Sequence, residues 1–383
     1  MPVPLLDVNA QNLPIEKELT EAFSRVLHSG QFIMGPDVTA FEAEVAQFVE
    51  AMHAIGVSSG TDAILLALMA LGIGPGDEVL CPTFTFFATA GCVARAGATP
   101  VFVDADPISF NLDVADAARK VTARTRAIIP VHLFGQSADM DAVMELAQKH
   151  KLAVIEDAAQ SLGAKYRGRS VGSIGPFGTY SFFPSKNLGA LGDAGMVVSN
   201  DDALAEKARL LRTHGSKPKY YHKLVGANFR LDSIQAAFLR VKLPHYNEYT
   251  KRRKANAAFY TEKLSKLPGV ALAADGADSS ARLILPVAQP HCDHIWNQYT
   301  IRVPGAGRRD AFRKHLTDLG IGSEIYYPVP MHEQECFAYC SAKSNCPTAA
   351  KLAQEVISVP IYPELQPPQL GEVVEAIAKF LHA

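Results

Sequence analysis

The sequence predicts an α/β protein with a mostly parallel central sheet covered by helices, followed by a smaller C-terminal α+β domain. Three observations lead to this prediction. Between about residues 50 and 200, apolar runs with the character of strands alternate with helical patterns, as they do in parallel sheets whose connections are helices. A chain of 383 residues is also too long for one ordinary hydrophobic core. Near residue 240 the alternation gives way to long helical segments.

The first half of the chain supplies the sheet elements in order. A short apolar run, AIGV, leads into residues 58–62 (SSGTD) and then into an apolar helical stretch. Further buried strands, each ending in polar or turn residues, are predicted over 77–82, 99–106, 126–135 and 152–161. Because ligands bind beyond the carboxyl ends of the strands in such sheets, the residues that follow these runs are the first candidates for a site.

The second half of the chain predicts a different architecture. Residues 231–267 have a long helical pattern that is bent or broken at Pro244. Short strands over 294–303, a helix over 308–320, a proline-rich loop and a terminal helix follow. We therefore place a large domain at 13–240 and a small domain at 241–383, and we expect residues 1–12 to pack on the small domain.

Charge and targeting signals exclude several classes of function. The formal net charge of −2, with no basic run or acidic tail, gives no general attraction to nucleic acid or to an anionic membrane. The N-terminus lacks the basic and apolar regions of a secretory signal, and the longest apolar stretch, 63–74, is too short to span a bilayer. We expect a cytoplasmic protein without a nucleic-acid or membrane partner.

The cysteines predict neither a disulfide framework nor a metal site. The chain has 6 cysteines, few for its length. Cys336, Cys340 and Cys346 follow His332 closely, but their spacing is not the CxxC pair typical of zinc ligands. We expect reduced thiols in a loop and a helix, and no bound metal.

Residues 58–62 are a candidate anion site. Gly60 lets the backbone approach a ligand, and Thr61 and Asp62 begin the apolar helix, where free N–H groups and the helix dipole favour a phosphate. Simple N-capping by Ser, Thr or Asp is the structural alternative. The segment is not a Walker loop, and the missing GxGxxG motif disfavours an NAD-dependent enzyme.

Two further features suit a planar, positively charged ligand. Asp157 lies at the end of an apolar run, where a buried carboxylate needs a cationic partner or strong donors; capping of a helix is the alternative. The stretch CPTFTFFATA places three phenylalanines after another strand. Such rings usually pack in the core, but one of them could lie flat against an aromatic cofactor.

Lys186 lies in SFFPSKNLGALGDAG, a loop of small residues between two predicted strands. A lysine at a ligand crevice can attack a carbonyl once a partly desolvated site lowers the pKa of its amine. Ser181 and Ser185 are nearby hydroxyl donors for a phosphate. A solvated loop lysine is the alternative for this residue taken alone.

Together these features match the requirements of one cofactor, pyridoxal phosphate. It needs an anion cradle, a planar residue over its ring, an amine for its aldehyde and an acid opposite its pyridine nitrogen. The acid keeps that nitrogen protonated, so that the ring withdraws electrons from a neighbouring carbanion. The sequence contains a candidate for each requirement.

Five motifs in order resemble the DegT-type (StrS-like) sugar aminotransferases. They are SSGTDA, CPTFTFFATA, VIEDAAQSLGA, SFFPSKNLGALGDAGMV and GANFRLDSIQAAFL, and the resemblance extends to 30–42 and 320–337. It implies the fold of the fold-type-I pyridoxal phosphate enzymes, with active sites shared across a homodimer. It also implies amino-sugar biosynthesis on nucleotide carriers, including that for lipopolysaccharide O-antigen.

The resemblance implies a role for each cofactor contact. Lys186 would hold the internal aldimine and move the proton between the substrate carbon and cofactor C4′, and Asp157 would pair with the pyridine nitrogen. Gln160 would reach the phenolic oxygen, and Phe86 rather than Phe87 would stack on the ring. The implied contacts around the phosphate are Gly60, Thr61, Asp62, Ser181 and, across the dimer, Asn228.

The implied reaction consists of two half-transaminations. An amino acid, usually L-glutamate in this family, leaves its nitrogen on the cofactor, and a nucleotide-linked keto-sugar takes it up. The loops at 30–37 and 323–332 would wall the sugar site, with Arg230 near the amino-donor carboxylate. The candidate sugar contacts, for which loop packing is the alternative, are Tyr326, Tyr327 and His332.

The choice of substrate is less constrained. The stretches WNQYTIRV and YYPVPMHEQECF resemble the branch that acts on 3-oxo sugars more than the branch that acts on 4-oxo sugars, and the carrier is dTDP or UDP. Relatives that act as pyridoxamine-dependent sugar dehydratases have a histidine in place of the lysine, so Lys186 disfavours dehydration. A catalytically silent nucleotide-sugar binder or regulator is an alternative of a different class.

Overall fold

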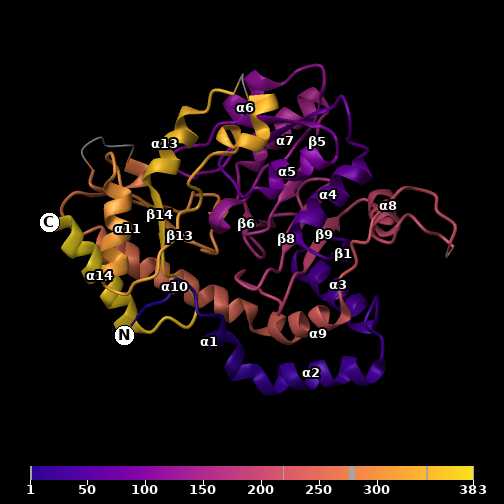
Figure 1. The fold of residues 1–383 in the computed structure, drawn as a ribbon, viewed down its shortest axis with the longest axis horizontal. Helices are drawn as coiled ribbons and strands as arrows, with labels where there is room; N and C mark the ends of the chain where they lie inside the picture. The colour runs from indigo at the N-terminus through magenta and orange to yellow at the C-terminus, as the bar shows by residue number, and fades with distance from the viewer. Residues whose placement is uncertain (1, 219, 276–280, 342–343, 383) are drawn as a thin grey trace.

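The computed structural model describes residues 2–218, 220–275, 281–341 and 344–382, and Figure 1 shows how its helices and strands are arranged. The strands are β1 (His53–Val57), β2 (Glu78–Pro82), β3 (Thr99–Val103), β4 (Thr125–Ile128), β5 (Ala153–Asp157), β6 (Lys165–Tyr166), β7 (Arg169–Ser170), β8 (Phe177–Ser181), β9 (Gly195–Ser199), β10 (Val270–Leu272), β11 (Leu283–Leu285), β12 (Cys292–Asp293), β13 (Tyr299–Arg302) and β14 (Val356–Val359). The helices are α1 (Val8–Asn12), α2 (Glu16–Ser29), α3 (Pro36–Phe48), α4 (Gly60–Leu71), α5 (Ala88–Arg95), α6 (Val114–Lys120), α7 (Met140–His150), α8 (Asp202–Arg212), α9 (Ser233–Lys242), α10 (Tyr246–Leu264), α11 (Arg308–Asp318), α12 (Ala338–Ser341), α13 (Pro347–Glu355) and α14 (Pro367–His382). None of the described helices combines the length and the hydropathy needed to cross a membrane.

A seven-stranded sheet forms the centre of the large unit, in the order β1-β9-β8-β5-β4-β2-β3. Strands β8, β5, β4, β2 and β3 pair in parallel, and β9 is antiparallel to both of its neighbours. Connections between the parallel strands are mostly helical, as such pairing requires. The structure confirms the predicted mostly parallel sheet.

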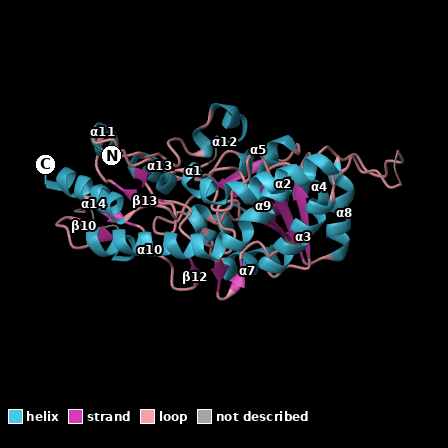
Figure 2. Cartoon of the chain, turned by 90° about the horizontal axis from the view of Figure 1, so that it is seen from below, coloured by secondary structure: helices cyan, strands magenta, loops and turns pink. Residues whose placement is uncertain are grey.

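Helices cover both faces of this sheet, and Figure 2 shows strands enclosed between helices. The coverage follows from the strands, which send apolar side chains alternately to each side. In β5, Ile155 packs in the core that includes α4 and α5, whereas Val154 packs in the core that includes α3 and α7. The next two residues of β5, Glu156 and Asp157, therefore point to opposite faces of the sheet.

A long helical segment links the large sheet to the C-terminal part of the chain (Figure 1). Its two helices, α9 and α10, are separated by a 3-10 turn at Leu243–His245. Pro244 lies within that turn and has no N–H for a helical hydrogen bond. The predicted break at Pro244 is confirmed.

The C-terminal part has its own four-stranded sheet, in the order β10-β11-β13-β14. Its core includes residues of α10, α11 and α14, and also Val3 from the N-terminus. The Val3 N–H donates to the Gly320 carbonyl at 2.9 Å. Helix α13 instead packs against the large unit through Ala349 and Leu352, so the division of the chain at residue 240 stays a prediction.

Of the short strands predicted over 294–303, only one forms, in the second half of this range, because the first half is a loop. The Ile295 N–H donates to the Gly135 carbonyl (3.0 Å) and the Asn297 N–H to the Phe134 carbonyl (2.9 Å), so both bind the large unit rather than a neighbouring strand. Trp296 has a positive φ of 54°, which is incompatible with a strand. Pairing begins at Tyr299, where β13 starts.

Candidate active site

The carboxyl edge of the large sheet brings together segments that are far apart in the sequence. β5 ends at Asp157, β8 ends at Ser181, and α4 begins at Gly60, just after β1. These strands lie on one side of the sheet, in the order β1-β9-β8-β5. The predicted anion site, acid and lysine loop therefore meet at a single edge.

The start of α4 lies unusually close to the end of β8. A Cβ atom at Gly60 would lie 2.7 Å from the Ser181 Cβ, so this approach requires glycine. Ser59 caps the helix by accepting the Asp62 N–H (3.1 Å), and the Asp62 carboxylate accepts the Ser58 hydroxyl (2.6 Å). Capping and anion binding are thus compatible here, because the first-turn N–H groups have no acceptors within the helix.

Asp157 is a buried carboxylate, only 4% exposed. Its Oδ2 accepts the Thr89 hydroxyl (2.8 Å), and its Oδ1 accepts the Ala159 N–H (3.2 Å). Burial raises the pKa of Asp157, whereas these two hydrogen bonds and the charge of Lys186 lower it. A cation placed against this carboxylate would offset the cost of its burial.

Lys186 lies in a turn after β8 that is held by its own backbone. The Lys186 N–H donates to the Phe183 carbonyl (2.8 Å), and the Ala190 N–H donates to the Phe182 carbonyl (2.8 Å). Burial lowers the pKa of the Lys186 amine to about 8, and the negative charge of Asp157 opposes this shift. Within the described residues the Nζ has no hydrogen-bond acceptor, so the structure contains a partly buried amine that is free to react.

A short chain of contacts leads from Gln160 to Phe86. The Gln160 Oε1 accepts the Phe134 N–H (2.6 Å), and its Nε2 donates to the Tyr327 hydroxyl (3.1 Å). The centre of the Tyr327 ring lies 6.4 Å from that of Phe86. Gln160 keeps one Nε2 hydrogen for a ligand, which is compatible with its predicted contact to a cofactor oxygen.

The two adjacent phenylalanines have different surroundings. The Phe87 ring stacks on Phe337 with centres 5.6 Å apart, and a Cβ at Gly91 would lie 2.7 Å from it. Phe86 is 58% exposed and Phe87 is 46% exposed, and both rings line, with Thr61, a hollow of about 480 Å³. Phe87 already has a stacking partner in Phe337, and Phe86 is the more exposed of the two rings.

Asn228 and Arg230 lie near the start of α4 on the same chain. Arg230 pairs with Val57 through an isolated bridge, and its Nε donates to the Asn228 Oδ1 (2.8 Å). Both side chains and Ser58 line a hollow of about 410 Å³. The predicted action of Asn228 across a dimer stays a prediction.

Residues 14–378 match the DegT/DnrJ/EryC1/StrS aminotransferase family. The chain belongs to this family. It is 49% identical to the pleiotropic regulatory protein of Geobacillus stearothermophilus, over 99% of both chains. It is 46% identical to the UDP-N-acetyl-3-dehydro-alpha-D-glucosamine 3-aminotransferase of Acidithiobacillus ferrooxidans, over 99% of this chain and 98% of the relative. Its fold matches that of S. venezuelae DesV in complex with a ketimine intermediate, with a TM-score of 0.93, 43% identity and coverage of 100% of this chain and 99% of that one.

Membership of this aminotransferase family confirms the predicted fold, enzyme class and cofactor, pyridoxal phosphate. The site fits that cofactor on four observations. Lys186 has a free amine, Asp157 is a buried carboxylate, Phe86 presents an exposed ring, and Gly60 closely approaches Ser181. These residues could hold the aldehyde, the ring nitrogen, the ring face and the phosphate, respectively.

The predicted sugar contacts of this aminotransferase are placed unevenly. The Tyr327 hydroxyl accepts a hydrogen bond from Gln160 and so lies in the site. Tyr326 lines a hollow of about 50 Å³ with Ser185. His332 is held by Thr83: its Nδ1 lies 2.7 Å from the Thr83 Oγ1, which also accepts the His332 N–H (3.0 Å). Loop packing accounts for these His332 contacts, and a role toward sugar stays a prediction for all three residues.

The cysteines that follow His332 do not gather into a metal site. The Cys340 thiol donates to the Phe337 carbonyl (3.4 Å), and the Cys346 sulfur lies 3.6 Å from the Lys120 Nζ. In the described parts of the chain, no three His, Cys, Asp or Glu side chains are arranged to hold a metal ion.

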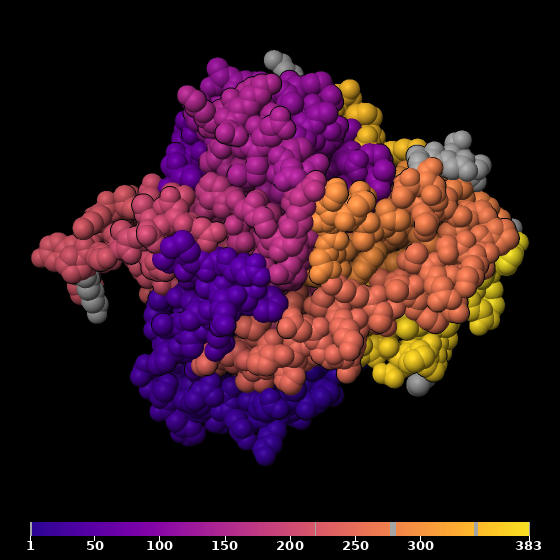
Figure 3. All heavy atoms as spheres, turned by 180° about the vertical axis from the view of Figure 1, so that it is seen from behind, coloured from indigo at the N-terminus to yellow at the C-terminus, as the bar shows by residue number. Residues whose placement is uncertain are grey.

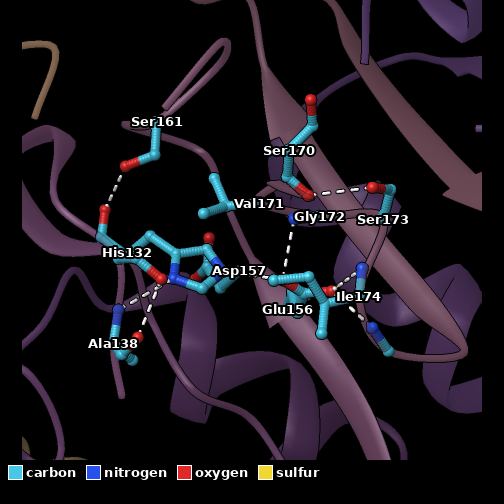
Figure 4. A network of polar contacts seen from close by, with 12 residues as sticks. His132, Ala138, Glu156, Asp157, Ser161, Ser170, Val171, Gly172, Ser173 and Ile174 are labelled. Atoms are coloured by element: carbon cyan, nitrogen blue, oxygen red, sulfur yellow. Dashed lines mark hydrogen bonds and ion pairs between the residues drawn. The ribbon is translucent and has the colours of Figure 1, made fainter. Parts of the chain in front are cut away.

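Three buried polar residues behind the site escaped the sequence analysis. Thr89 donates to Asp157, and His132 and Glu156 pair on the other face of β5 (Figure 4). The available signal was a polar residue inside an apolar run, as in IIPVHLFG and AVIED. Because burying such a side chain alone is costly, its position in these runs indicates a partner.

Proposed function

We propose that this aminotransferase moves the amino group of L-glutamate to the 3-oxo group of a nucleotide-linked sugar. The proposal depends on one observation, the free, partly buried amine of Lys186 beside the buried carboxylate of Asp157. The relative named for a UDP-linked 3-dehydro sugar matches nearly the whole chain and supports both the 3-oxo position and the UDP carrier. A 4-oxo sugar and a dTDP carrier are the alternatives.

Pyridoxal phosphate supplies an aldehyde that condenses with amines and a ring that withdraws electrons. Asp157 favours the protonated ring nitrogen, because a buried carboxylate is stabilised by an adjacent positive charge. The Lys186 Nζ takes the proton from the α-carbon of the amino donor and delivers a proton to the sugar carbon. A pKa of about 8 suits both transfers, since acid–base groups act best near the working pH. Phe86 covers the ring and excludes water from one face.

Substrate contacts extend outward from this centre. We assign the amino-donor carboxylate to Arg230, and the sugar hydroxyls to Tyr326, Tyr327 and His332. Tyr327 has the strongest support, because it contacts Gln160 and lies beside Phe86. A sugar nucleotide is large and anionic, which suits the open hollows at this edge better than an enclosed apolar slot.

We further propose that the enzyme acts as a homodimer in the cytoplasm, in amino-sugar biosynthesis such as that for O-antigen. Figure 3 shows the segment after α8 extending away from the body. Tyr221 and Val225 in this segment are 70% and 91% exposed, as is typical of apolar residues that a partner covers. All six cysteines are free thiols, in accord with a reducing compartment.

The first experiment tests the cofactor and its lysine. Purified protein should be yellow, and borohydride followed by peptide mass analysis should place the cofactor on Lys186. Lys186→Ala is the control, which should take up the cofactor without covalent fixation. A colourless wild-type protein that takes up no pyridoxal phosphate would overturn the proposed function.

The second experiment tests the substrate and the shared site. Glutamate is assayed with matched 3-oxo and 4-oxo sugars on UDP and dTDP, and the aminated carbon is read from the product by mass and proton coupling. Mixing inactive Asn228→Ala and Lys186→Ala proteins should restore part of the activity if one protomer completes the site of the other. A fully active monomer, measured by ultracentrifugation at the assay concentration, would contradict the dimer.

The name of one relative, pleiotropic regulatory protein, favours a second candidate function, that of a nucleotide-sugar-binding regulator. Such a protein would bind nucleotide sugars but would not aminate any member of the panel. The free amine of Lys186 weighs against this candidate, because a binder does not need a reactive lysine.

A further inference from the structure

A buried pair, His132 and Glu156, lies directly behind the acid of the site. Both side chains are fully buried, and the His132 Nε2 lies 3.0 Å from the Glu156 Oε2 (Figure 4). Glu156 precedes Asp157 in β5 and points to the opposite face of the sheet. The pair therefore shares a strand with the site without entering it.

Hydrogen bonds fix the proton on this histidine. The Ala138 N–H points at the His132 Nδ1 (3.1 Å), so Nδ1 is an acceptor and the single ring proton lies on Nε2. The Nε2–H then donates to Glu156. His132 is thus held between a backbone donor at Nδ1 and the Glu156 carboxylate at Nε2.

Every polar group around the Glu156 carboxylate donates to it. Besides His132, its Oε2 accepts the Gly172 N–H (2.7 Å), and its Oε1 accepts the N–H groups of Ile174 (2.7 Å) and Gly175 (2.6 Å). Figure 4 shows the carboxylate aimed at this loop. Four donors offset the cost of burying its charge.

The same pair joins three segments that carry residues of the site: strand β5, the loop before β8, and the segment after β4. The loop at 171–176 leads into β8 and so to Ser181 and Lys186, and β8 pairs with β5 through Asp157 and Thr179. From the third segment, after β4, the His132 N–H donates to the Asp157 carbonyl (2.9 Å). Two residues later, the Phe134 N–H holds the amide of Gln160.

We propose that His132 and Glu156 are positioning residues, which fix the direction of Asp157 toward the cofactor ring nitrogen and the spacing between β5 and the lysine strand β8. This inference rests on the proposed function, since it assumes that Asp157 faces a cofactor. Four bonds to one carboxylate hold the end of β5 in a single geometry. Loosening them lets the Asp157 carboxylate turn while the fold persists.

The test compares Glu156→Gln with a matched control, Glu355→Gln. Glu355 is also a buried carboxylate, but it accepts Arg302 (3.0 and 2.7 Å) in the small sheet, away from the site. In Glu156→Gln, one carboxylate oxygen is replaced by an NH2 group. This group cannot accept a hydrogen bond from the N–H donors that face it. Both variants should melt at a lower temperature than the wild type.

Only Glu156→Gln should alter the bound cofactor. The midpoint of the pH titration of its visible absorbance should shift by about half a unit or more. The kcat should fall roughly 10- to 100-fold, with a smaller change in KM, because the misplacement acts on the reacting groups. Glu355→Gln should keep both values at the wild-type level.

A second pair of variants tests the histidine and covers the case in which Glu156→Gln does not fold. His132→Gln can still donate to Glu156 and should retain the wild-type titration, whereas His132→Leu cannot donate and should reproduce the shift. Titrations of Glu156→Gln and His132→Leu that match the wild type, despite lower melting temperatures, would overturn the inference and leave the proposed function intact. A wild-type protein with no visible absorbance would instead overturn both.

Discussion

Two lysines, one within the loop between β8 and β9 and one that contacts this loop, have the same lowered pKa, yet their surroundings differ. Lys186 lies in the loop between β8 and β9, and burial lowers its pKa to about 8. Lys242, at the end of α9, is fully buried, and burial lowers its pKa to about 8 as well. The Lys242 Nζ donates to the Gly189 carbonyl (2.7 Å), in the loop that contains Lys186.

The difference teaches that a lowered pKa alone does not identify a reactive lysine. Lys242 has an acceptor, which fixes its amine against the loop, whereas the amine of Lys186 is free within the described structure. The negative charge of Asp157 also acts on Lys186 and opposes the lowering of its pKa. Asp157 lies at the carboxyl edge of the sheet, where ligands bind. Availability and position, rather than desolvation, separate the reactive lysine from the structural one.

The sharpest way to break this comparison is Lys186→Ala. Removing the amine removes both the attachment of the cofactor and the proton carrier, so activity should fall by about 10³-fold or more. Turnover with glutamate and the oxo-sugar panel measures the loss, and equilibrium dialysis should still detect cofactor bound without a covalent link. Activity near the wild-type level would reject the assigned role.

Asp157→Asn should have the next largest effect. The amide lacks the charge that favours a protonated ring nitrogen, so the single-turnover rate should fall roughly 10²- to 10³-fold. Rapid-mixing absorbance with glutamate measures this rate, and Glu355→Gln serves as the control for loss of a buried carboxylate away from the site. An unchanged rate would mean that Asp157 has no role in the reaction. Its presence would then not explain why Lys186 is reactive and Lys242 is not.

A pH profile tests the reactive lysine without any substitution. Because the neutral amine attacks the aldehyde, the rate at which apoenzyme captures pyridoxal phosphate should rise with pH and reach half its maximum near pH 8, the pKa of Lys186. Well below that midpoint the rate should change about tenfold per pH unit, as the neutral fraction does. A midpoint near 10.5, the ordinary pKa of lysine, would contradict tuning by burial.

Lys242→Met should have the smallest effect on chemistry. The variant leaves the Gly189 carbonyl without its donor, which costs about 1–3 kcal/mol, but it also removes a buried amine. Cofactor capture and kcat should therefore stay within about tenfold of the wild type, and the capture profile should keep its midpoint.

The stability of Lys242→Met should also differ from that of the wild type in a pH-dependent way. Folding lowers the pKa of Lys242 from 10.5 to about 8, so the unfolded state binds more protons between these values. The unfolding free energy of the wild type relative to the variant should therefore rise with pH across this window. Urea unfolding at several pH values measures it, and a flat difference would show that Lys242 does not titrate there.

The sequence predicted those elements whose signals are local. The break at Pro244 follows from a missing N–H, and the end of β5 at Asp157 follows from an apolar run that stops at an acid. Within the short strands predicted over 294–303, the first half does not pair, because the N–H groups of Ile295 and Asn297 bind carbonyls about 160 residues away along the chain. No local pattern encodes such a partner.

The sequence by itself determined the alternating architecture, the order of the motifs and the chemistry of the site: an amine, an acid, an aromatic ring and a helix start. Only the tertiary structure decided which side chains are free. The Phe87 ring stacks on Phe337, whereas the Phe86 ring lies near Tyr327. The Lys242 amine is held by the Gly189 carbonyl, whereas the Lys186 amine has no acceptor among the described residues. Residue type sets what a group can do, whereas its availability depends on neighbours that the folded chain brings from distant positions.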